Sequence, residues 1–190
     1  MGTEDLKFSK TWVTGDGGPI ILMEKVLLPY WEGSNAPSNG RVVKAESRWG
    51  LDVATDYDLA CDIDDWSGVI NVVNGSAFVL GTSGDNMATW VPDFAPNGAL
   101  VEWGYADRED ELIEAARNFV DRAEFSSCVE FVVRSSPLVL FMAVESGDDP
   151  TYDRIEFEIE MGKYNVSSGL RETEKSLVIC HSFDLQDGKL

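Results

Sequence analysis

Long apolar runs and histidines are both scarce in this 190-residue sequence. No apolar stretch approaches the roughly 18 residues that a membrane-spanning helix needs. The segment Met1 to Lys10 carries Glu4 and Asp5 and has no apolar centre, so we expect no signal peptide, no membrane partner and a cytoplasmic protein. A zinc-binding helix motif with two histidines is impossible, because His181 is the only histidine.

Basic residues are also few. There are 15 lysines and arginines against 34 aspartates and glutamates, which gives a formal net charge of −19. No basic residue lies between Arg48 and Arg108, a window with ten acidic residues. Nucleic-acid binding requires a basic surface that displaces counterions, so we expect no nucleic-acid partner. Such a charge indicates either high solubility or a basic partner.

Cysteine is rare as well. Cys61, Cys128 and Cys180 are odd in number and far apart in the chain, which is typical of reduced thiols in a cytoplasm. A chain of this length buries about 70% of its unfolded surface, so it needs neither a disulfide nor a metal to fold. We expect one domain spanning residues 1–190, without a cofactor.

Most of the sequence is typical of β-strands joined by turns. Apolar and charged residues alternate most clearly over Tyr152–Met161, which indicates a strand with one wet face. Asn74-Gly75 predicts a hairpin turn between two flanking strands. A last strand places His181 on an apolar face. This last strand covers 177–185, the hairpin strands cover 68–73 and 77–81, and the other predicted strands cover 11–14, 19–23, 100–105, 129–134 and 138–144.

Residues 107–125 form the one clear helical pattern. Asp107 suits the N-cap, and an apolar stripe follows at helical spacing: Leu112, Ile113, Ala116, Phe119, Val120 and Ala123. A short helix around Asp56–Ile63 would be capped by Asp56 or Asp58. Because strands outnumber helices and follow one another through turns, the sequence predicts an α+β fold, mainly antiparallel sheet with one principal amphipathic helix packed on it.

The densest set of potentially functional side chains is acidic and comprises Asp56, Asp58, Asp62, Asp64 and Asp65, followed by Trp66. Counted from Asp62, Trp66 takes the fifth position and Val73 the twelfth, so the spacing does not match a calcium loop and we predict no metal site. The cluster is then either a solvated turn or a docking surface for a basic partner, with Tyr57 and Trp66 adding apolar contact.

A second acidic row consists of Glu156, Glu158 and Glu160, on the wet face of the alternating strand. Like charges on a strand discourage edge pairing and aggregation, which is one explanation for the row. The other is that these three residues form a secondary candidate surface for a partner.

No catalytic motif is present. The sequence has no Gly-x-Ser-x-Gly elbow, and Gly15–Gly18 lacks the lysine and hydroxyl residue of a phosphate loop. His181 is better explained as a core residue than as a catalytic base. Most of the six tryptophans are expected in the core: Trp12, Trp31, Trp49, Trp66, Trp90 and Trp103. A sugar- or small-ligand-binding β module, using tryptophan and aspartate, is an alternative function, and a hydrolase is a third.

An ordered series of short motifs resembles the immunity protein 21 family of bacterial polymorphic toxin systems. It begins with Trp12-Val13, Gly17–Leu22 and Leu27–Gly33. The other segments that carry it are Asp56–Asp58, Ala60-Cys61, Gly68–Ile70, Val79–Gly81, Thr89–Pro92, Trp103–Asp107, Leu140-Phe141, Ser146-Gly147, Gly162–Val166 and Ser176–Ile179.

The resemblance implies a cytoplasmic antitoxin that binds a toxin domain stoichiometrically and catalyses nothing. The family offers no catalytic residues to transfer, and its repeated tryptophan and glycine positions look structural. If the toxin is a nuclease, its basic groove would complement the charge of this chain. The candidate toxin-binding residues are then the five aspartates named above and Trp66.

Overall fold

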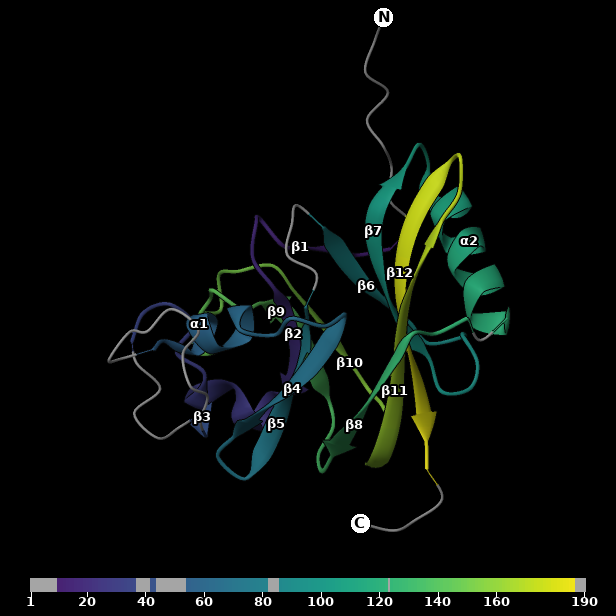
Figure 1. The fold of residues 1–190 in the computed structure, drawn as a ribbon. Coiled ribbons are helices and arrows are strands. Elements are labelled where there is room, and N and C mark those ends of the chain that lie inside the picture. Colours follow the sequence, from purple (N-terminus) through teal and green to yellow (C-terminus); the bar gives the residue numbers. More distant parts are fainter. Residues whose placement is uncertain (1–9, 37–41, 44–53, 82–85, 123, 187–190) are drawn as a thin grey trace, which may run out of the picture.

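The computed structural model describes residues 10–36, 42–43, 54–81, 86–122 and 124–186 (Figure 1). The helical elements are η1 (Lys25–Tyr30), α1 (Asp56–Cys61) and α2 (Glu109–Arg122). The strands are β1 (Val13–Thr14), β2 (Ile20–Glu24), β3 (Val42–Val43), β4 (Ser67–Val72), β5 (Gly75–Leu80), β6 (Met87–Val91), β7 (Ala99–Ala106), β8 (Ser127–Val133), β9 (Leu138–Met142), β10 (Arg154–Phe157), β11 (Gly162–Glu172) and β12 (Ser176–Leu185).

The strands form two six-stranded sheets. Sheet A has the order β1-β6-β7-β12-β11-β8, and sheet B has the order β10-β9-β2-β5-β4-β3. Neighbouring strands pair antiparallel in both sheets. The prediction of an α+β fold built mainly on antiparallel sheet, with one principal helix, is therefore confirmed.

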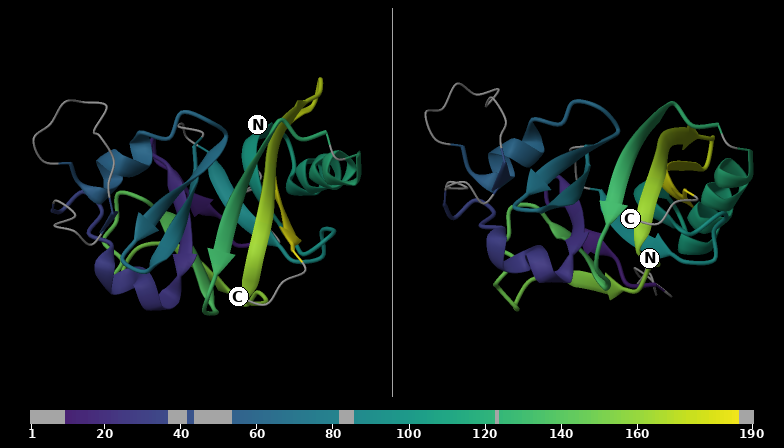
Figure 2. Two further views of the ribbon diagram at one scale, coloured as in Figure 1. Left: turned by 60° about the horizontal axis from the view of Figure 1, so that its bottom comes forward. Right: turned by 90° about the horizontal axis from the view of Figure 1, so that it is seen from below.

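The elements stack in four layers (Figures 1 and 2). Side chains from both sheets meet in a central core around Phe78, Phe131 and Phe183. Helix α2 covers the outer face of sheet A through Leu112 and its neighbours, while η1 and α1 cover the outer face of sheet B. Because both faces of each sheet are covered over much of their area, many strand residues are buried on both sides.

Helix α2 follows its predicted apolar stripe, since Leu112, Ala116, Phe119 and Val120 are buried. It begins at Glu109, so Asp107 is not its N-cap; the carbonyl of Arg108 accepts the first-turn hydrogen bond from Leu112. Two contacts of the Glu109 carboxylate hold the incoming chain: Oε1 of Glu109 accepts from Nε1 of Trp12 and from the backbone of Lys10, both at 3.0 Å.

The predicted β4–β5 hairpin is present, but its turn lies one residue earlier than Asn74-Gly75. Val72 pairs with Gly75, so the two loop residues are Val73 and Asn74. Gly75 is the first residue of β5, where a Cβ would lie 2.5 Å from a methyl carbon of Leu27 in η1. With this register Val73 lies in the turn and takes a positive φ of 54°.

Two short loops connect strands that do not pair with each other. Gly15–Gly18 leads from β1 in sheet A to β2 in sheet B, and Ser135–Pro137 leads from β8 in sheet A to β9 in sheet B. These short connections hold the two sheets together. Within the described ranges, no helix is both long enough and apolar enough to cross a bilayer.

Candidate functional site

The acidic segment that follows Thr55 is anchored by a capping box. Thr55 Oγ1 accepts from the backbone of Asp58 at 3.1 Å, and Asp58 Oδ2 accepts from the backbone of Thr55 at 2.8 Å. Thr55 is the cap of α1, so neither Asp56 nor Asp58 is, and α1 ends at Cys61. This reciprocal pair fixes the helix start and uses part of the Asp58 carboxylate.

Asp56 is fully buried. Its Oδ2 accepts from the backbone of Glu32 at 2.6 Å, which attaches α1 to the segment after η1. A side chain without accessible surface cannot contact a partner, so Asp56 is removed from the predicted docking surface. Its role in this fold is to hold two segments together.

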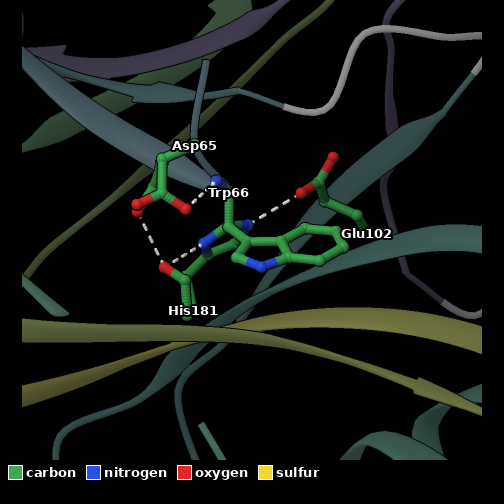
Figure 3. Close-up of polar contacts among 6 residues, drawn as sticks. Asp65, Trp66, Glu102 and His181 are labelled. Atoms are coloured by element: carbon green, nitrogen blue, oxygen red, sulfur yellow. Dashed lines mark hydrogen bonds and ion pairs between the residues drawn. The ribbon is translucent and has the colours of Figure 1, made fainter. Parts of the chain in front are cut away.

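Asp64 and Asp65 are exposed, while Asp62 and Trp66 are half-buried. Asp65 Oδ1 accepts from the Trp66 backbone at 2.7 Å (Figure 3). The turn is held in place because Gly81 donates to the Trp66 carbonyl at 3.1 Å. A Cβ at Gly81 would lie only 2.0 Å from the Asp65 carbonyl oxygen, so this close approach requires glycine. The result is a surface turn, fixed at Asp65 and Trp66 by these backbone contacts, in which two exposed aspartates precede a half-buried tryptophan.

The second candidate row is less regular than predicted. β10 ends at Phe157, so Glu156 alone lies in the strand, and Glu158 and Glu160 follow it. All three are exposed. Glu156 pairs with Lys25 at 2.9 Å, and Glu158 accepts from the Ser136 hydroxyl at 2.5 Å. The strand stops early because Ser136 binds the following segment, with its Oγ accepting from the backbone of Ile159 at 3.1 Å.

His181 lies in the core, as its apolar strand face predicted, and is fully buried. Its Nε2 lies 2.7 Å from Glu102 and its Nδ1 lies 2.8 Å from the Ser168 hydroxyl (Figure 3). The Ser168 hydroxyl also bonds to that of Ser67 at 2.8 Å. Three of these residues come from β7, β11 and β12 in sheet A, and Ser67 begins β4 in sheet B, next to Trp66.

This network contains the residue types of a hydrolytic triad, but its residues are buried in the core, where they connect the two sheets by hydrogen bonds. Ser168 and His181 are 0% exposed and Glu102 is 1% exposed, so a substrate has no route to the hydroxyl in this conformation. Sequence inspection did not identify Glu102 or Ser168, since they lie 79 and 13 residues from His181. Glu102 and Ser168 come next to His181 only through the pairing of β7, β11 and β12.

The tryptophans offer little surface for a sugar. Trp12, Trp31, Trp90 and Trp103 are buried, as predicted, and Trp49 lies outside the described residues. Of the five described tryptophans, Trp66 has the most accessible surface. The residues the structure describes contain no group of three or more His, Cys, Asp or Glu side chains arranged to hold a metal ion.

A family model described as immunity protein 21 matches residues 11–176. The chain belongs to this family. The resemblance seen in the ordered motifs is thereby confirmed, and family membership supports an immunity role with a cognate toxin as partner. No curated protein and no solved structure gives a match.

The part of the chain that matches immunity protein 21 contains the whole acidic segment, both candidate surfaces, and the residues Glu102 and Ser168. It ends at Ser176, the first residue of β12. His181 therefore lies beyond the match.

Proposed function

We propose that this chain neutralises its toxin by stoichiometric binding in the cytoplasm, without turnover, and that residues 1–190 act as one domain. The observation that carries this proposal is the fixed surface of Asp64, Asp65 and Trp66. It combines exposed negative charge with an aromatic contact, the two features that anchor many interfaces. Asp62 and the accessible part of Asp58 extend it.

The charge of the chain supports a basic toxin. A net charge of −19 would accelerate encounter with a basic domain, and speed matters when the free partner is lethal. The aspartate surface is small compared with a blocking interface, which buries on the order of 1,600 Å². Neighbouring surface must therefore also take part.

The test uses the cognate toxin domain in an inactivated form. The triple variant Asp62→Asn, Asp64→Asn, Asp65→Asn should slow association at least tenfold at low salt, and the difference should shrink as salt rises. The matched control is Glu156→Gln, Glu158→Gln, Glu160→Gln, which changes the net charge by the same amount on the secondary candidate surface.

We expect the control to bind like the wild type. If both triple variants associated equally slowly with the toxin, the total charge of the chain would set the rate, and not the aspartate surface. Loss in the glutamate variant alone would move the interface to β10 and the segment that follows it.

A further inference from the structure

β8 differs from the other strands at the ends of the two sheets. β1 and β3 have two described residues each and β10 has four, as expected for edges that avoid pairing with other chains. β8 has seven residues, pairs only with β11 among the described strands, and shows no register shift in that pairing. It also carries no proline or lysine. An edge of this kind offers unpaired backbone groups to another strand.

A groove of about 380 Å³ lies beside this edge (β8 and the β4–β5 hairpin are visible together in Figure 2). Glu130, Val132 and Arg134 line one side and residues of the hairpin line the other. The two sheets are joined near the start of β8. There Ser67 bonds to Ser168, and Ser168 pairs with Ser127, the first residue of β8. The accessible part of the edge is therefore its second half.

The hairpin side of the groove combines apolar and polar surface. Val69 and Val73 supply apolar contacts, while Asn71 and Ser76 supply hydrogen-bonding groups. An extended peptide uses both kinds of surface, since its backbone bonds to a strand edge and its alternate side chains enter the groove.

The charges at the edge favour a foreign strand over a second copy of this chain. If β8 paired antiparallel with itself about its central residue, Glu130 would face Glu130 of the copy, and like charges directly opposite are destabilising. Glu130 already pairs with Lys163 on β11. The backbone N–H of Arg134 donates to the Glu24 carboxylate at 2.8 Å, but its exposed guanidinium forms no ion pair among the described residues, so this group can pair with an acidic residue of the incoming strand.

We propose that an extended segment of the toxin adds to β8 in this groove, over Glu130–Val133, with a carboxylate against Arg134. The proposal rests on the proposed function, and it extends the interface: β4 begins directly after Trp66, and its Val69 and Asn71 line the groove. A toxin that contacts both the aspartate surface and the groove would gain the additional area that a blocking complex needs.

The first test measures amide hydrogen exchange in the wild-type chain, free and bound to an inactivated form of its cognate toxin domain. Exchange of the β8 amides that point away from β11, within Glu130–Val133, should slow at least tenfold in the complex. Binding without this protection would overturn the β8 proposal and leave the proposed function standing. Failure to bind at all would contradict both.

The second test substitutes side chains that line the groove and measures toxin binding. Asn71→Trp fills the groove and should weaken toxin binding at least tenfold. The matched control Asn118→Trp, on the exposed face of α2, should bind normally. Arg134→Glu should weaken binding more than Arg134→Lys does. Equal affinity of Asn71→Trp and Asn118→Trp would contradict occupation of the groove, and the exchange measurement needs no variant to fold.

Discussion

Nε2 of His181 lies 2.7 Å from Oε1 of Glu102, in a site where neither side chain is more than 1% exposed. When a neutral His181 donates through Nε2, its Nδ1 accepts from the Ser168 hydroxyl, and Ser168 then accepts from Ser67. The direction of each hydrogen bond follows from the first. This chain of polar groups connects sheet A to sheet B through an otherwise apolar core.

Removing the Glu102 end of this network should cost more than removing the Ser67 end. Glu102→Ala leaves the buried Nε2–H of the His181 imidazole without an acceptor and should lower the free energy of unfolding by about 1–3 kcal/mol. Ser67→Ala removes a single hydrogen bond and leaves Ser168 bonded to His181, so it should cost only about 0.5–1.5 kcal/mol. Urea denaturation of the three proteins measures the difference. Equal costs would contradict a network organised around His181.

The hairpin turn contains a strained residue that can be relieved. Val73 has a φ of 54°, a conformation that a β-branched residue rarely adopts, and its side chain is exposed. Val73→Gly should raise the free energy of unfolding by about 1 kcal/mol, since the strain of a left-handed residue exceeds the extra chain entropy of glycine. Val73→Asn should have a smaller effect of the same sign. A fall in thermal stability of both variants would show that the turn is not strained.

The three thiols should react at different rates. Cys128 is exposed on β8, whereas Cys180 is buried, and burial raises the pKa of its thiol well above the ordinary value. Since only the thiolate reacts, Cys128 should be labelled first and Cys180 only after unfolding. Burial also raises the pKa of the half-buried Cys61. A thiol titration checks this order, and Cys128→Ser should remove the fast phase.

Tyr164 should make the fold sensitive to alkali. Burial raises its pKa to about 12 from an unfolded value of about 10, and its hydroxyl donates to the Glu160 carbonyl at 2.7 Å. Between these two values the unfolded chain releases the proton first, so stability should fall as pH rises through this window and be unaffected below it. Tyr164→Phe should be less stable than the wild type at pH 9, but its free energy of unfolding should fall less between about pH 10 and 12. Parallel pH profiles would contradict this assignment.

Local sequence patterns predicted the helices and strands better than they predicted which segments these elements pack against. The stripe of α2 and the hairpin residues around Asn74 were sufficient to place those elements, because period and turn chemistry are local. The cap of α1 was predicted wrongly at Asp56 or Asp58, although Thr55 stands three residues before Asp58 as in a capping box. The register of the hairpin could not be predicted, because contacts such as that between Leu27 and Gly75 join segments far apart in the chain.

At the candidate site, too, local sequence patterns were informative and long-range contacts could not be predicted. Six residues were predicted at the docking surface from their density along the chain, yet Asp56 turned out to be buried. Its partner is the backbone of Glu32, 24 residues earlier, and no local signal reports that contact. The groove beside β8 was not foreseen either, because a strand becomes an edge only through the order of the whole sheet. Long-range pairing therefore determines which polar residues remain available for binding.

The most direct test mixes the purified chain with an inactivated form of its cognate toxin domain and measures stoichiometry and heat by calorimetry. We predict a one-to-one complex that is tight at low salt and weakened by Asp62→Asn, Asp64→Asn, Asp65→Asn. Absence of a complex, with the isolated chain instead converting the toxin or another substrate catalytically, would contradict it.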